Sequence, residues 1–170
     1  AYYATGTVFN YNDNNSQQYA DLTAWQNGNG SDANSVFANP QYVSGFDLHA
    51  QSVNLDQAGT DRPEITVDIE GEPRLSPPDI GADEFVAAAE DAALVRVTNP
   101  FKAFPEGAND VAVELLNNGV DTLRTATIAW EVNGQAQLDF AFSGALAPGL
   151  EDSVVIGDFP FQSDSAYAIT

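Results

Sequence analysis

The sequence contains no cysteine and no methionine, only five lysine or arginine residues, and a single histidine. Without cysteine, the chain can form neither disulfides nor thiolate metal sites. Its 25 acidic residues give a formal net charge of -20, so it cannot assemble the basic patch that nucleic-acid binding requires. One histidine excludes a multi-histidine metal site. No apolar run is long enough to span a bilayer, so we expect no membrane insertion.

Because even an initiator methionine is missing, we expect the chain to be a piece of a longer polypeptide. Prolines and turn residues interrupt the apolar pieces between residues 31 and 85, which predicts irregular β structure there. One short helix is expected earlier. Asp21 is suited to cap its first turn, Leu22 and Trp25 share one face, and Gly28 is expected to end it.

The composition changes at residues 86–93, which are small and acidic, and we place a boundary between two domains near Ala88. After it, strand patterns start about every ten residues, as in an antiparallel β-sandwich. Alternating apolar positions predict buried side chains in two of these strands. The motif "NNG" supplies residues that tolerate positive φ, and "NGQ" is expected to form a type I′ hairpin turn. The predicted buried positions are Val111, Val113 and Leu115 in one strand, and Ile128, Trp130 and Val132 in the other.

Seven motifs precede the boundary in this order: "DLTAWQ", "GSDANSV", "ANPQYVS", "DLHAQS", "DQAGT", "DIEGEPR" and "PDIGADEF". Together they resemble the closing segment of secreted bacterial right-handed parallel β-helix proteins. The resemblance implies that residues 1–87 are the C-terminal part of such a helix and that "DIGADEF" seals its end. From the residues themselves, we expect Ile69 and Ile80 to point inward and Asp79 to accept backbone N–H groups. Arg74 is expected to pair with Asp68, Asp79 or Asp83.

Residues 92–170 resemble the immunoglobulin-like, cell-adhesion-related modules of bacterial surface proteins. The motifs are "DVAVELLNNGVDTL", "ATIAWEVNG" and "ALAPGLEDSVVIGDF". The family pattern needs one more strand after the closing "AYAIT", so the resemblance implies that the sandwich lacks its last strand. The predicted fold class is therefore all-β: the end cap of a right-handed parallel β-helix followed by an immunoglobulin-like antiparallel β-sandwich.

The sequence offers three candidates for a functional site. The acid pairs Asp68 with Glu70 and Asp83 with Glu84 are of the type that glycoside hydrolysis uses, but such pairs are expected by chance in so acidic a chain, and we assign no catalytic residue. The lone His49 is interpreted as a packed or surface residue. Calcium is the candidate cofactor, because oxygen ligands cluster in two turn segments. Neither segment has the spacing of an EF-hand loop, and turn formation on a solvated acidic surface explains the same residues. The predicted ligands are Asn12, Asp13, Asn14, Asp32 and Asn34.

These observations predict a non-catalytic structural or adhesive module of a large secreted or cell-surface bacterial protein. The expected partners are extracellular polysaccharide or neighbouring protein subunits, and several tyrosines near the amino end are candidates for sugar stacking. Two alternatives stay open. One is the C-terminal part of a polysaccharide lyase or glycoside hydrolase, and the other is a filament subunit assembled by strand exchange. The candidate tyrosines are Tyr2, Tyr3, Tyr11, Tyr19 and Tyr42.

Overall fold

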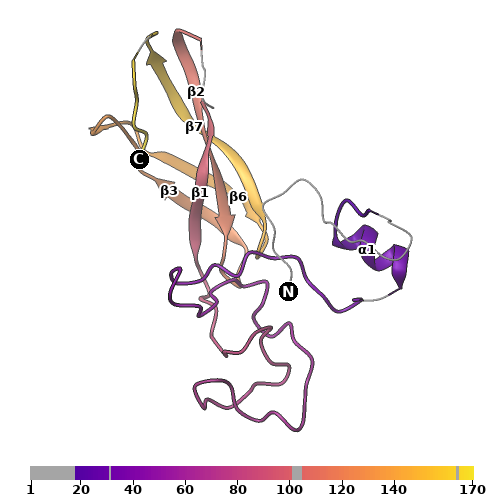
Figure 1. Cartoon of the computed structure of the whole chain (residues 1–170). Coiled ribbons are helices and arrows are strands. Elements are labelled where there is room, and N and C mark those ends of the chain that lie inside the picture. The colour runs from indigo at the N-terminus through magenta and orange to yellow at the C-terminus, as the bar shows by residue number, and fades with distance from the viewer. Residues whose placement is uncertain (1–17, 31, 101–104, 164) are drawn as a thin grey trace. The chain divides into compact units, whose positions relative to one another are not determined.

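The computed structural model describes residues 18–30, 32–100, 105–163 and 165–170 (Figure 1). The chain divides into two units, Ala1–Ala87 and Ala88–Thr170. The described part contains one short helix and antiparallel strand pairs, which confirms the all-β class at that level. Every pairing between its named strands is antiparallel. Predicted ligands Asn12, Asp13 and Asn14 lie outside the described residues.

The helix α1 spans Leu22–Asn29 and begins as the sequence predicts. The Asp21 carboxylate accepts a hydrogen bond from the backbone N–H of Ala24 at 2.7 Å, which satisfies one free donor of the first turn. The predicted end at Gly28 is wrong, because the left-handed residue that ends the helix is Gly30, at φ 68°. Gly28 instead lies against the ring of Tyr19, where a Cβ atom would come within 2.2 Å of Cε1.

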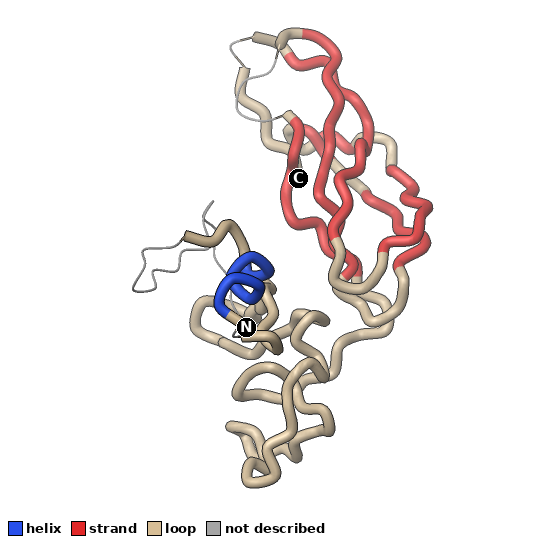
Figure 2. The backbone as a smooth tube through the Cα atoms, turned by 90° about the vertical axis from the view of Figure 1, so that its right-hand side faces the viewer, coloured by secondary structure: helices blue, strands red, loops and turns tan. Residues whose placement is uncertain are grey.

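The rest of the first unit is held by turns and isolated bridges, such as the antiparallel bridge between Val67 and Pro73. Figure 2 shows residues 32–87 as loop throughout, and no described residue among them belongs to a strand. The prediction that Ile69 points inward is wrong, since its side chain is 75% exposed. The neighbouring Asp68 is buried instead. Its carboxylate is required inside as a hydrogen-bond acceptor, so the next side chain faces out.

The second unit contains two sheets and a small hairpin. Strands β1, β2 and β7 form an antiparallel sheet in the order β1-β2-β7, β3 pairs with β6, and β4 pairs with β5. The first sheet and the β3–β6 pair contribute side chains to one apolar core. The strands span Ala92–Asn99 (β1), Gly107–Asn117 (β2), Leu123–Ile128 (β3), Glu131–Val132 (β4), Gln135–Ala136 (β5), Phe140–Leu146 (β6) and Glu151–Phe161 (β7).

The core of the second unit contains the side chains that period-two alternation predicted to be inside. Val111 and Val132 are almost completely buried, and Trp130 donates its indole N–H to the carbonyl of Leu138 at 3.0 Å. A buried indole N–H needs such an acceptor, because leaving it unpaired costs free energy. The predicted burial is confirmed at all six positions, but the alternation is incomplete, since Ala112 on the opposite face of β2 is buried as well. The buried apolar set is Val111, Val113, Leu115, Ile128, Trp130, Val132, Phe142, Leu146, Val154, Ile156 and Phe161.

The type I′ turn predicted for one of the two turn motifs of this unit is confirmed, and the other motif uses its glycine differently. Asn133 and Gly134 both have positive φ, at 51° and 75°, between β4 and β5, as a type I′ turn requires. The "NNG" motif does not use positive φ. Gly119 is needed there for space, since a Cβ atom would lie 2.7 Å from the backbone oxygen of Ala89 and the backbone nitrogen of Asp91.

The segment that ends at Thr170 pairs with β4. The backbone groups of Glu131 and Thr170 exchange two hydrogen bonds at 2.8 and 3.1 Å, and Val132 bridges Ile169. The closing segment "AYAIT" thus contributes an isolated bridge and no named strand. Among the described strands, β7 pairs only with β2, so its other edge has no strand partner among them.

Candidate functional site

The motifs "DIEGEPR" and "DIGADEF" are joined by buried carboxylates that accept backbone hydrogen bonds. Oδ1 of Asp68 accepts the N–H groups of Glu70 at 2.9 Å and Glu72 at 2.8 Å, which closes the turn around Gly71. Oδ2 of the same side chain accepts the N–H of Glu84 at 3.1 Å, sixteen residues along the chain. Gly71 has φ 92°, a conformation that glycine adopts without strain.

Asp79 and Glu84 extend this arrangement. Asp79 accepts the N–H groups of Gln57 and Phe85, both at 2.7 Å, as predicted for a carboxylate that binds backbone N–H groups. Glu84 accepts the N–H of Asp79 at 3.0 Å and that of Leu75 at 3.2 Å. In a segment without strands, carboxylates take the place of the carbonyl partners that a sheet would supply.

Arg74 pairs with Glu84, which corrects the prediction of Asp68, Asp79 or Asp83. Its Nη1 lies 2.6 Å from Oε1 of Glu84, and its Nη2 donates to the carbonyl of Gly81 at 2.7 Å. Both side chains are largely buried. Glu84 also accepts two backbone N–H groups, so its carboxylate both neutralises the guanidinium charge and satisfies backbone donors.

The pKa values of these carboxyls follow from two opposed causes. Burial by itself would raise the pKa of Asp68, but the N–H donors of Glu84, Glu72 and Glu70 outweigh it, so the pKa lies below its usual value. Burial likewise opposes ionisation of Glu84, but the hydrogen bond from Arg74 and two backbone N–H groups lower its pKa.

For Asp79, burial prevails over its two backbone donors, and the pKa is raised. The three buried carboxyls therefore do not respond alike to pH.

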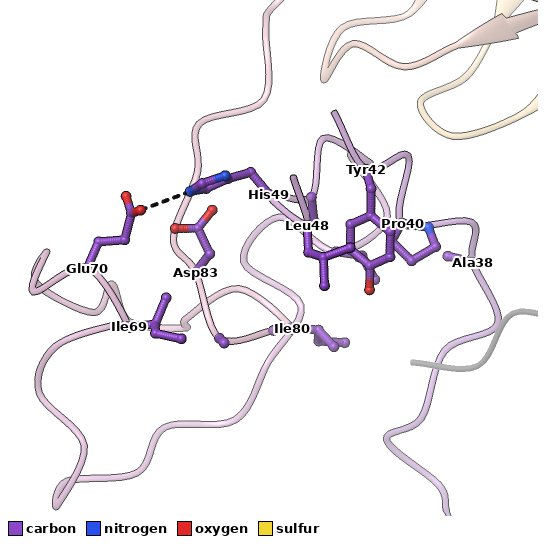
Figure 3. A pocket seen from close by; sticks show the side chains of 13 residues that line it. Ala38, Pro40, Tyr42, Leu48, His49, Ile69, Glu70, Ile80 and Asp83 are labelled. Carbon is purple, nitrogen blue, oxygen red and sulfur yellow. Dashed lines mark ion pairs between the residues drawn. The ribbon is translucent and has the colours of Figure 1, made fainter. Parts of the chain in front are cut away.

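A second cluster lies beside these carboxylates and includes the only histidine. Nε2 of His49 lies 3.1 Å from Oε1 of Glu70, and one ligand atom each from His49, Glu70 and Asp83 lie within 4.8 Å of one another. Figure 3 shows both acidic side chains extending toward the His49 ring. Nδ1 of His49 is hydrogen-bonded to Oδ1 of Asp47. An imidazole and two carboxylates can hold a cation or exchange a proton.

The sequence brings the cluster together through the turns described above. Glu70 follows Asp68 by two residues and Asp83 precedes Glu84, so the buried member of each acid pair fixes the backbone from which the outer member projects. A hydrogen bond from the N–H of Ile69 to the carbonyl of Ala82, at 2.9 Å, joins the two turns.

The pKa of His49 is shifted strongly by the carboxylates that surround its ring. Its hydrogen bond to Asp47, followed by that to Glu70, raises the pKa of His49 to about 9. The imidazole is therefore charged at neutral pH, with both N–H groups donating. The pKa of Asp47 is lowered by the same hydrogen bond. Burial, together with the charges of Asp68 and Glu70, raises the pKa of Asp83 even though His49 opposes that effect.

The cluster borders a pocket of about 610 Å³ in the first unit. Besides His49, Glu70 and Asp83, its walls are mostly apolar (Figure 3). Tyr42, one of the tyrosines considered for sugar stacking, is half-exposed at the pocket wall, whereas Tyr19 is buried. The main apolar lining residues are Pro40, Tyr42, Leu48, Leu55, Ile69 and Ile80.

The two predicted calcium ligands that are described lie elsewhere. Oδ2 of Asp32 accepts the indole N–H of Trp25 at 2.6 Å, and its Oδ1 is 3.4 Å from the hydroxyl of Ser35. Asn34 is exposed. The Asp32 carboxylate therefore ties α1 to the following turn, and the calcium site stays a prediction.

The sequence interpretation missed His49 as a member of a cluster. Its partners lie 21 and 34 residues away in the chain, and no short motif spans those distances. A usable signal was that each "DI" motif carries an acid near its glycine: Glu70 directly before Gly71, and Asp83 two residues after Gly81.

Comparisons of the chain with family models, with curated proteins and with solved structures find no match. Among the described residues, no helix has the length and apolar character needed to cross a membrane.

Proposed function

We propose that this chain is a non-catalytic structural module of a large secreted or cell-surface bacterial protein. In this proposal residues 1–87 are the C-terminal part of a right-handed parallel β-helix, and residues 92–170 are an immunoglobulin-like sandwich with an adhesive role. The observation that carries the proposal is the use of Asp68, Asp79 and Glu84 as acceptors for seven backbone N–H groups.

This arrangement suits the end of a repeat stack. The last turn of a solenoid has no following repeat to supply carbonyl acceptors, so its N–H groups need side-chain partners. The same hydrogen bonds engage two of the acids considered for catalysis, Asp68 and Glu84, which favours the structural role. The strongly acidic chain suits a soluble, extracellular module, with polysaccharide or neighbouring subunits as partners.

The test is to incubate the chain with a panel of neutral and acidic polysaccharides. Retention of the chain on immobilised polysaccharide is measured beside the release of reducing ends and unsaturated products. We expect retention, or none, without turnover. Turnover that is lost in Asp83→Asn and kept in the exposed-acid control Glu64→Gln would contradict the proposal. It would favour the alternative of a polysaccharide lyase or glycoside hydrolase.

A second candidate, a filament subunit assembled by strand exchange, is favoured by β7. This eleven-residue strand pairs only with β2 among the described strands. An edge of that length is able to accept a strand from another chain. Sedimentation velocity at high protein concentration decides between the two: a concentration-dependent oligomer supports strand exchange, and a monomer throughout excludes it.

A further inference from the structure

We propose that His49, Glu70 and Asp83 form a binding site for one divalent transition-metal ion of the zinc class. The ligands would be Nε2 of His49 and one carboxylate oxygen from each acid. This site is separate from the predicted calcium ligands, and it does not depend on the structural function proposed above.

The donor set selects the class of metal. Calcium and magnesium favour oxygen ligands throughout, whereas an imidazole nitrogen combined with carboxylates suits zinc and the neighbouring first-row metals. Three protein ligands leave a tetrahedral ion with one open position. The three ligand atoms already lie within 4.8 Å of one another, so an ion can bridge them with little movement.

Asp47 supplies the outer partner that metal-binding histidines require. Its Oδ1 accepts the N–H of Nδ1, which keeps that nitrogen protonated and directs Nε2 toward Glu70. Ligating histidines usually donate their other ring N–H to a carboxylate in this way, which fixes the ring orientation. Nε2 is therefore the nitrogen that exchanges its proton for the metal, and binding releases that proton.

The two carboxylates are mounted on backbone that is already fixed. The turn that carries Glu70 is closed by Asp68, and the backbone N–H of Glu84, next to Asp83, donates to the same Asp68 side chain. Such preorganisation lowers the entropy cost of bringing ligands together. A surface ion pair between long, unsupported side chains lacks this support.

The proposed metal site borders the pocket described above. Glu70, Asp83 and His49 lie at one side of the cavity, and Leu48, Ile69 and other apolar side chains form much of the rest. A small ligand would fit this pocket if one oxygen or nitrogen atom binds the metal and the rest of the ligand is apolar. The first experiment tests binding of the metal alone.

Because the chain has one histidine, its imidazole resonances in NMR spectra report directly on this site. Titration with Zn²⁺ at neutral pH is expected to shift the His49 ring nitrogens at one equivalent, with Nε2 shifting most, whereas the same concentration of Ca²⁺ leaves them unchanged. Asp83→Asn and Glu70→Gln should each weaken binding about tenfold or more, and Asp47→Asn by about 10–100-fold.

The matched control is Glu72→Gln, which removes an exposed charge two residues from Glu70 and should leave affinity unchanged. Equal weakening by Glu72→Gln and Asp83→Asn would mean diffuse attraction to an acidic surface and would overturn the site. No shift of the His49 resonances with millimolar Zn²⁺ would also overturn it. If Asp83→Asn alters the backbone spectrum, the absorbance of bound Co²⁺ in His49→Gln and wild-type protein decides: equal spectra contradict the proposal.

Discussion

The two units of this chain supply hydrogen-bond acceptors to their backbone N–H groups in different ways. In the second unit, a continuous apolar core lies between antiparallel strands whose N–H groups bond to neighbouring strands. In the described part of the first unit, few apolar side chains are buried, and carboxylates inside the coil receive the backbone N–H groups. The difference shows that a segment without strands can still satisfy its backbone, provided that acidic side chains are buried at the right places.

The largest effect is expected from breaking the apolar core. Phe161 is 1% exposed, and its ring contacts those of Phe159 and Tyr167 edge to face. Phe161→Ala should lower the free energy of unfolding of the second unit by about 3–5 kcal/mol, from lost burial and the cavity left behind. Urea unfolding followed by the fluorescence of Trp130, in a Trp25→Phe background, measures it. A change below about 1 kcal/mol would contradict the assigned core.

Breaking the carboxylate arrangement should affect only the first unit. Asp68→Ala removes the acceptor of the Glu70, Glu72 and Glu84 N–H groups. We expect hydrogen exchange of these three amides to accelerate about tenfold or more, because N–H groups that have lost their acceptor become accessible to water more often. Exchange in β2 should stay unchanged. Glu64→Ala, which removes an exposed acid from the same unit, is the control; equal acceleration there would mean a general charge effect.

Substitution of one glycine in each unit should have a smaller effect, and it compares a turn that requires positive φ with one that does not. No atom lies within 4 Å of an added Cβ at Gly134 or at Gly45, but only Gly134 has positive φ. Gly134→Ala should therefore destabilise the second unit by roughly 1–2 kcal/mol through backbone strain alone. Gly45→Ala should be neutral or slightly stabilising for the first unit. Thermal unfolding of both variants tests this, and a neutral Gly134→Ala would contradict the type I′ turn.

The sequence was informative where structure depends on neighbours in the chain. Burial of Val111 and Trp130 follows from period-two alternation, and capping by Asp21 from one side chain and the next turn. Prediction from the sequence failed where the partner of a residue lies far away in the chain. Hydrophobicity alone predicts that Ile69 is buried, because no neighbouring residue shows that Asp68 is buried to accept the N–H of Glu84. The sequence did not predict the His49 cluster for the same reason, since its three members come together only after both turns have formed.

The most direct test of the carboxylate account is an NMR titration of every side-chain carboxyl in the intact chain. Asp68 and Glu84 should titrate below their usual pKa values, and Asp79 above its own. Asp68 and Glu84 then stabilise the first unit above their ordinary pKa values, and this contribution is lost as the pH falls through the lowered ones. Asp79 acts oppositely, since its contribution is present at low pH and is lost as the pH rises through its raised pKa. If all three carboxyls titrate together with the exposed acids, the buried acceptors do not exist in solution and the account is wrong.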